Sequence, residues 1–207
     1  MKLKINFLTK IPKGNAKNEL IFINNRNFKH KTLNQKEIIH NELFKEKKII
    51  QRNHEEGNYI LINCIDQKKS SDFENIGSKL FDFLSTNKIE NIFFNLSLLK
   101  ITNVQIERIL HGATLKSYSF EIYKTKKKNN SNFININIVG KNSKSALRTK
   151  LDALTEGIFL TRDLVSEPGN ILHPDEYATR IAKLRKLGIK VTIYDKKKLK
   201  QLGCGAL

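Results

Sequence analysis

The sequence contains few cysteines and no long apolar run. Its 207 residues include two cysteines, Cys64 and Cys204, three prolines, one methionine and no tryptophan. Two thiols cannot form the dense disulfide framework of a small secreted domain, so we expect both to be free in a reducing compartment. No apolar stretch approaches the 18 or so residues that a membrane helix needs. We therefore expect a soluble, globular protein in the cytoplasm.

Sequence signals for export and for metal binding are also missing. The stretch from Met1 to Lys10 alternates apolar and polar residues, which leaves no room for the apolar segment of about 7 to 15 residues in a signal peptide. The five histidines are scattered, without a His-Glu-x-x-His pair or a cysteine pair beside them. We therefore expect no export signal and no metal site in this chain.

Acidic side chains are scarce relative to basic ones. There are 38 Lys and Arg against 20 Asp and Glu, a formal net charge of +18. The electric field of such a charge attracts polyanions. Lysines that are not accompanied by arginine or aromatic side chains contact phosphates but do not recognise a base sequence, so weak and non-specific binding is expected. A composition drawn towards AT-rich codons explains the lysines equally well, since Asn and Ile are also abundant. The candidate contacts to a polyanion are Lys124, Lys126, Lys127 and Lys128.

Residues 1–140 alternate strand-like and helix-like segments. The expected strands cover 4–8, 20–23, 48–51, 58–65, 89–96 and 133–139, and the expected helices cover 32–48, 70–87 and 102–118. Ser71 or Asp72 is expected to cap the second helix, and Thr102 opens the third. This alternation predicts an α/β domain with a mixed, mostly parallel sheet flanked by helices.

The remaining residues predict a linker and the start of a second domain. Apolar residues on one face of 141–167 predict a long linker helix, which Pro168 breaks. In the segment 168–207 we expect a helix over 175–187, a strand over 189–194 and a further helix over 196–202. We expect Glu167 to be a solvated or capping carboxylate. The predicted organisation is thus an N-terminal domain, a linker helix and the truncated beginning of another α/β domain.

The most specific pattern lies in the last fifth of the chain. It reads Thr161-Arg-Asp-Leu-Val-Ser-Glu-Pro-Gly-Asn-Ile-Leu-His-Pro-Asp-Glu-Tyr-Ala, and the sequence closes on Leu202-Gly-Cys-Gly-Ala-Leu. This order resembles the entry into the catalytic domain of leucyl aminopeptidases, also called cytosol aminopeptidases. Cys204 departs from the family, in which Met is more usual at that position. The matching residues are Arg162, Asp163, Leu164, Val165, Pro168, Asn170, Pro174, Tyr177, Ala178, Leu202, Gly203, Gly205, Ala206 and Leu207.

A second segment resembles the same family independently. Gly112 is followed by a Tyr-x-Phe-x-x-Tyr-Lys run that begins at Tyr118 and ends at Lys124. Family members carry such a run near the end of their N-terminal domain. The two matches occur in the family's order.

The resemblance implies a fold, an activity and a position for the catalytic residues outside these 207 residues. It implies the macro-like N-terminal domain of leucyl aminopeptidases and an enzyme that releases N-terminal amino acids from peptides with two divalent metals, Mn or Zn. It also implies a family-type hexamer. The family's catalytic and metal-binding residues follow the position that Leu207 matches. We therefore expect no catalytic or metal-binding residue in these 207 residues, which alone would be inactive and serve as a scaffold.

Two alternatives accompany this interpretation. Arg162 and Asp163 resemble a catalytic pair of guanidinium and carboxylate, but at the end of a linker helix we expect them, with Pro168, to form a structural hinge between domains. The other function considered is a stand-alone basic module that binds nucleic acid non-specifically after loss of the catalytic half.

Overall fold

The structure is a computed structural model in which a defined set of residues is described. Most of the predicted helix over 32–48 falls outside that set, and for 144–148 only the backbone is considered. The described residues are 2–12, 18–23, 33, 38, 45–46, 48–54, 57–65, 67, 69–96, 101–125, 133–140 and 144–205.

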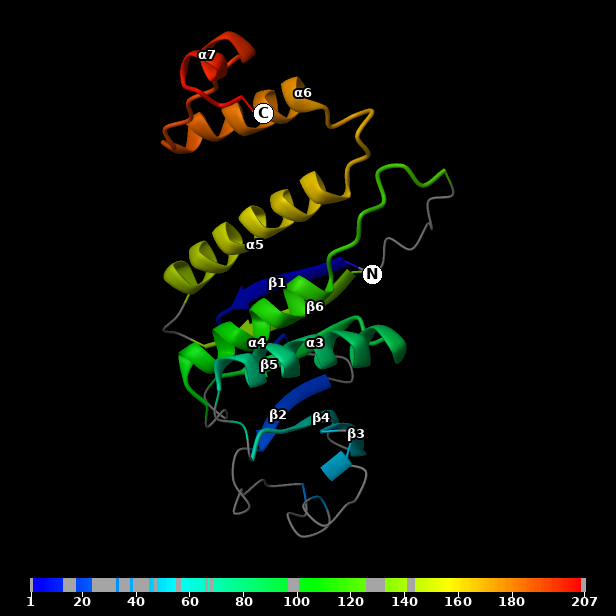
Figure 1. Cartoon of the computed structure of the whole chain (residues 1–207). Helices are drawn as coiled ribbons and strands as arrows, with labels where there is room; N and C mark the ends of the chain where they lie inside the picture. Colours follow the sequence, from blue (N-terminus) through cyan, green and yellow to red (C-terminus); the bar gives the residue numbers. More distant parts are fainter. Residues whose placement is uncertain are drawn as a thin grey trace. The chain divides into compact units, whose positions relative to one another are not determined.

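Six strands form one mixed sheet in the order β1-β6-β5-β2-β4-β3 (Figure 1). Neighbouring strands run parallel, except that the edge strand β3 is antiparallel to β4. The α/β class and the mostly parallel sheet predicted from the sequence are thereby confirmed. The strands are β1 (Lys2–Leu8), β2 (Asn18–Ile23), β3 (Ile49–His54), β4 (Gly57–Asn63), β5 (Asn91–Asn95) and β6 (Phe133–Val139).

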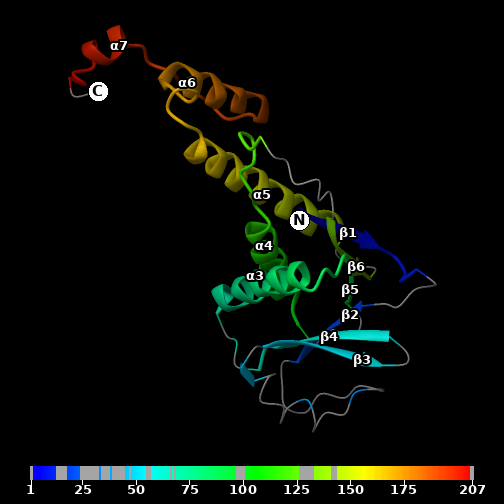
Figure 2. The same cartoon turned by 90° about the vertical axis from the view of Figure 1, so that its right-hand side faces the viewer.

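In the chain, α3 lies between β4 and β5 and α4 between β5 and β6, and the other described helices come after β6. Figures 1 and 2 show α3 and α4 lying side by side along the sheet. The described helices are α3 (Ser70–Thr86), α4 (Asn103–Lys116), α5 (Lys144–Ser166), α6 (Pro174–Ala182), the 3₁₀ helix η1 (Lys183–Leu187) and α7 (Lys196–Gln201). None of them is long and apolar enough to cross a membrane.

Side-chain alternation along the strands builds an apolar layer on each face of the sheet. In β4, Ile60 and Ile62 join the large cluster that also contains residues of α3 and α4, whereas Tyr59 and Leu61 join a smaller cluster with Ile23. Successive side chains of a strand point to opposite faces, so the two clusters lie on opposite sides of the sheet. This is why β4 is almost entirely apolar, as expected of a strand covered on both faces.

Hydrogen bonds of polar side chains lie at the first residues of α3 and α4. Thr102 Oγ1 accepts a hydrogen bond from the Gln105 N–H, and Gln105 Oε1 accepts one from the Thr102 N–H, at 3.3 and 2.8 Å. This reciprocal pair opens α4 where the sequence predicted. The helix α3 starts at Ser70, as predicted, so neither Ser71 nor Asp72 occupies the capping position. There Lys69 is the capping residue, and the Asp72 carboxylate accepts its N–H at 2.9 Å.

The chain divides into two compact units, 1–157 and 158–207. The first contains the sheet, α3, α4 and the beginning of α5, and all of the buried apolar core. In the second, every residue from 158 to 205 is at least partly exposed. The division falls within the predicted linker helix 141–167, and the three-part organisation predicted from the sequence stays a prediction.

Two predictions in the second unit were wrong. The segment 189–194 is not a strand, because a strand needs a hydrogen-bonded neighbour and no strand of the sheet lies within the described residues of this unit. The helix expected over 175–187 is α only as far as Ala182 and continues as the 3₁₀ helix η1. Such tightening is common at the end of a helix. Gly188, in the left-handed conformation with φ of 81°, follows Leu187 and ends it.

Candidate functional site

The helices α3 and α4 approach each other closely at two glycines. A Cβ atom at Gly77 would overlap the Ile109 carbonyl of α4, and one at Gly112 would overlap the Glu74 carbonyl of α3. Only glycine permits such contact between backbones. This crossing therefore fixes the register of the two helices and of the polar side chains that project from them.

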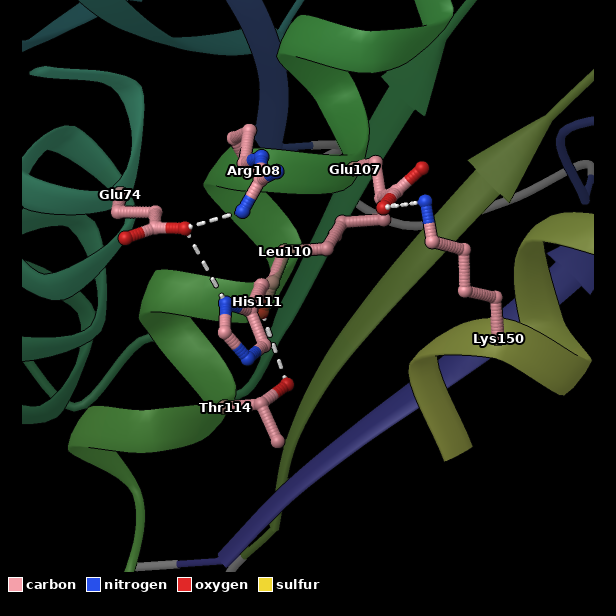
Figure 3. A network of polar contacts seen from close by, with 7 residues as sticks. All are labelled: Glu74, Glu107, Arg108, Leu110, His111, Thr114 and Lys150. Atoms are coloured by element: carbon pink, nitrogen blue, oxygen red, sulfur yellow. Dashed lines mark hydrogen bonds and ion pairs between the residues drawn. The ribbon is translucent and has the colours of Figure 1, made fainter. Parts of the chain in front are cut away.

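A network of polar side chains lies beside this crossing (Figure 3). Arg108 Nη1 donates a hydrogen bond to Glu74 Oε1 at 2.8 Å, and His111 Nδ1 lies 3.4 Å from the same oxygen. Figure 3 shows Arg108 and His111 projecting from α4 towards Glu74 on α3. One carboxylate of α3 thus faces two basic groups that lie three residues apart, on one side of α4.

The surroundings of Glu74 favour its ionised form. Burial acts to raise the pKa of Glu74, but the hydrogen bonds and positive charges of Arg108 and His111 outweigh it and hold the pKa below its ordinary value. Arg108 Nε and His111 Nε2 are buried and have no hydrogen-bond partner in the described part of the chain. Opposite charges of Glu74 and Arg108 therefore face one another between two packed helices, which is the chemistry of a structural ion pair.

A second ion pair connects α4 to the beginning of α5. Lys150 Nζ lies 2.7 Å from Glu107 Oε1, and the Glu107 side chain is only 14% exposed. Next to it in the chain, Leu151 is buried in the same apolar cluster as Ile109 and Leu110 of α4. The beginning of α5 is therefore held to the first unit by both an apolar and a charged contact (Figure 3).

Sequence reasoning missed this network. The available signal was the pair of glycines within otherwise regular helical patterns, since a glycine inside a helix costs about 1 kcal/mol relative to alanine and usually marks a close packing contact. Gly112 was noted as part of a family pattern but was not connected to Gly77. Partners 34 and 37 residues apart, such as Glu74 with Arg108 and His111, cannot be paired without the tertiary structure.

The residues predicted as a hinge lie together in the second unit. The Asp163 carbonyl accepts the Glu167 N–H at the end of α5, at 3.0 Å. The Pro168 carbonyl accepts the N–H groups of Ile171 and Leu172, both at 2.9 Å. Arg162 and Asp163 also take part in other interactions. Their role as an inter-domain hinge, together with Pro168, stays a prediction.

The prediction for Glu167 was wrong. Its side chain is only 4% exposed and accepts a hydrogen bond from Arg180 Nη1 at 2.9 Å, while Arg180 Nε donates to Glu176 at 2.8 Å. Arg180 thus lies between two carboxylates, one at each end of the turn that joins α5 to α6. The guanidinium fork supplies the geometry that makes both contacts possible.

Only one of the four candidate lysines lies within the described residues. Lys124 Nζ lies 3.2 Å from Glu121 Oε1, whereas Lys126, Lys127 and Lys128 fall outside the described residues. In the family-like run that ends at Lys124, the Phe120 and Tyr123 rings pack with centroids 5.8 Å apart. Nucleic-acid binding by the lysines therefore stays a prediction.

The metal ions implied by the family resemblance find no ligand set in the described chain. Its residues include no group of three or more His, Cys, Asp or Glu that could hold a metal ion. No described residue is therefore assigned to metal binding.

Comparison with curated proteins finds relatives described as probable cytosol aminopeptidases. The chain is 42% identical over 115 residues to a probable cytosol aminopeptidase of Phytoplasma mali, a match that covers 53% of this chain and 23% of the relative. It is 40% identical over 99 residues to the probable cytosol aminopeptidase of Methylorubrum extorquens, covering 46% and 20%. The match thus spans less than a quarter of each relative. No family model matches the chain.

Solved structures share the fold over nearly the whole chain. A point mutant of tomato leucine aminopeptidase superposes with a TM-score of 0.67 at 19% identity, covering 98% of this chain and 46% of that one. The bottromycin maturation enzyme BotP in complex with Mn gives a TM-score of 0.64 at 15% identity, covering 91% and 40%. The fold is therefore the α/β fold found in leucine aminopeptidase. The identity of about 40% over half of its length makes this chain a homologue of proteins described as probable cytosol aminopeptidases, in agreement with the motifs.

Proposed function

We propose that this chain supplies the N-terminal α/β domain, the linker helix and the first elements of the catalytic domain of a leucyl aminopeptidase. In this proposal its own residues take no part in breaking the peptide bond. The enzyme as a whole releases N-terminal amino acids from peptides in the cytoplasm. The observation that carries the proposal is the 42% identity to a probable cytosol aminopeptidase over 115 residues.

The internal structure supports a scaffold role. The polar network around Glu74 joins α3 to α4 through an ion pair and a contact to His111. The Glu107–Lys150 pair and Leu151 then connect this scaffold to α5, the helix that leads into the second unit. These contacts hold the beginning of α5 to the first unit, and in this proposal they act in packing and not in catalysis.

Divalent metal ions belong to the proposed whole enzyme and not to this chain. One structural neighbour is described in complex with Mn, and two metals can together polarise a scissile carbonyl and lower the pKa of a bound water. Since the described residues offer no suitable cluster, the metal ligands of the enzyme would come from other residues. Assembly into a family-type hexamer is likewise proposed only for the whole enzyme.

The test is hydrolysis of a leucine chromogenic amide with Mn²⁺ or Zn²⁺ by two purified proteins. The first is the 207-residue chain, and the second is a chimera in which this chain replaces the matching part of the Phytoplasma mali relative. We expect turnover by the chimera only. Turnover by the short chain would overturn its non-catalytic role, and a folded chimera without activity, beside an active parent, would count against the scaffold function.

A further inference from the structure

Basic residues concentrate in one segment of the second unit. Residues 183–200, called the basic segment below, contain seven Lys and one Arg but a single carboxylate, that of Asp195. Eight basic residues in 18 are more than twice the share in the whole chain, which has 38 in 207. A composition drawn towards AT-rich codons enriches lysine along the whole chain and does not by itself explain this local excess.

The charge of the basic segment is not neutralised within the second unit. Asp195 Oδ1 accepts the Lys198 N–H at 2.7 Å and thereby caps α7. Elsewhere in the unit, Glu167 and Glu176 are paired with Arg180. None of the seven lysines of the basic segment forms an ion pair with a described residue. Residues 158–207 as a whole hold ten basic and five acidic side chains.

The first unit offers no excess of negative charge either. Residues 1–157 contain 28 basic and 15 acidic side chains, so the first unit is itself strongly positive. A second copy of the chain would bring the same positive excess, and like charges repel. The charge complement of the basic segment is therefore an anionic partner.

The fold of the basic segment ties its two groups of lysines together. Lysines lie on both η1 and α7. Across the turn at Gly188, Arg185 Nε and Nη2 donate to the Val191 carbonyl at 3.1 and 2.8 Å, which holds the connection towards α7 against η1. These bonds also engage the segment's only guanidinium. The lysine ammonium groups that remain are point charges without the planar fork that recognises a base edge.

A nucleic acid fits these features better than a membrane surface does. A duplex carries about one charge per 1.7 Å of its axis, so lysines on two neighbouring elements can each meet a phosphate. A cationic helix binds an anionic membrane through an apolar face that enters the interface. With five and six residues, η1 and α7 are too short to present such a face, and Leu199 is the only apolar residue of α7.

We propose that the basic segment binds the phosphate backbone of nucleic acid through its seven lysines, without preference for a base sequence. This site is separate from the lysines at 124–128 that the sequence suggested. The inference goes beyond the proposed function and does not rest on it, because phosphate binding requires no peptide hydrolysis.

The test is fluorescence anisotropy of a labelled DNA duplex titrated with the purified 207-residue chain at several salt concentrations. With about five to seven lysines in contact, the logarithm of the association constant should fall against the logarithm of the salt concentration with a slope of about −4 to −6. We expect equal affinities for two duplexes of unrelated sequence. An affinity that does not depend on salt, or a strong preference for one duplex, would overturn the inference.

Three variants of equal net charge locate the contact. Each replaces three lysines by Gln, and the first changes α7. The second is a control in the first unit, at lysines that form no ion pair with a described residue. The third changes the run that the sequence suggested. The substituted positions are Lys196, Lys197 and Lys198 in the first variant, Lys2, Lys4 and Lys79 in the second, and Lys126, Lys127 and Lys128 in the third.

The three variants should differ although their charges are the same. We expect the α7 variant to flatten the salt slope by about 2 to 3 and to weaken binding at least about tenfold at 0.1 M salt, whereas both controls change the slope by less than about 1. Equal losses in all three variants would show that only total charge matters and would overturn the site. A loss confined to the third variant would overturn it in favour of the other lysines.

Two further measurements cover the remaining outcomes. If circular dichroism shows that the α7 variant does not fold, a variant with Gln at Lys183, Lys186 and Lys190 takes its place, and the same loss is expected. Sedimentation of the chain with vesicles of phosphatidylcholine and phosphatidylserine tests the membrane. Binding to these vesicles without binding to the duplex would overturn the assignment to nucleic acid.

Discussion

Gly77 of α3 and Gly112 of α4 lie at one helix crossing, where each α-carbon faces a backbone carbonyl of the opposite helix. Neither position has room for a methyl group. The ion pair between Glu74 and Arg108 lies next to this crossing. Close backbone approach and charge pairing therefore reinforce each other in joining the two helices.

Replacing Gly112 by Ala tests the crossing directly. The added Cβ would overlap the Glu74 carbonyl, and because a backbone atom cannot rotate away, the helices must separate. We expect a loss of about 1 to 3 kcal/mol in the free energy of unfolding, the usual range for overpacking a core. Urea unfolding followed by circular dichroism measures this loss.

Gly157 supplies the matched control. It lies inside α5, and no described atom lies within 4 Å of the Cβ that alanine would add. We expect Gly157→Ala to be neutral or to stabilise by up to about 1 kcal/mol through helix propensity. Equal effects of the two substitutions would show that the crossing is looser than described.

The Glu74 carboxylate predicts a specific dependence of stability on pH. Because its pKa is lower in the folded than in the unfolded chain, its contribution is fully present above the ordinary value of 4.5 and is lost as the pH falls through the lower folded value. We expect Glu74→Gln to destabilise the chain by about 1 to 3 kcal/mol at pH 7. The difference from wild type should shrink as the pH is lowered from about 5 to about 3.

Unfolding of both proteins by urea across this pH range measures the effect. Glu121→Gln is a suitable control, because the Glu121–Lys124 pair is exposed and lies within one turn of the chain. Exposed pairs of this kind contribute little to stability. A difference between wild type and Glu74→Gln that does not change with pH would contradict the charge-paired role of Glu74.

The two cysteines should differ strongly in reactivity. Burial raises the pKa of the Cys64 thiol to about 12, although the Lys48 charge acts in the opposite direction. At pH 8 only about one Cys64 in ten thousand is then a thiolate, the form that reacts with disulfide reagents. We expect one thiol per chain, that of the less buried Cys204, to react rapidly with Ellman's reagent, and the second to react only after urea is added. Two fast thiols in the native chain would contradict the buried position of Cys64.

The contacts of Arg180 predict a local effect in the turn after α5. Lysine at this position would keep the charge but could not bridge Glu167 and Glu176 with a planar fork. We expect Arg180→Lys to speed amide exchange at Ile171 and Leu172, whose N–H groups donate to the Pro168 carbonyl. Exchange in β6 of the first unit should be unchanged, and exchange that rises equally in both places would indicate global destabilisation instead.

Several elements could be predicted from local pattern because neighbours in the chain determine them. The alternation of 133–139 predicts β6, Thr102 predicts the start of α4, and Pro168 predicts the end of α5. The family resemblance likewise rests on residues close together in the chain. Local spacing could not predict that the second half of the 175–187 helix tightens to 3₁₀, since this depends on how the helix end is held.

The sequence by itself determined the α/β class, most element positions and the relationship to cytosol aminopeptidases, since each depends on periodicity or on short motifs. Only the tertiary structure decided which distant segments meet. It placed β1 beside β6, where Asn6 Nδ2 donates to Asn137 Oδ1 across 131 residues of sequence, and it paired Glu74 with Arg108. It also left 189–194 without a neighbouring strand. A strand is defined by the hydrogen bonds it makes to another segment, so its own residues can indicate it but cannot form it alone.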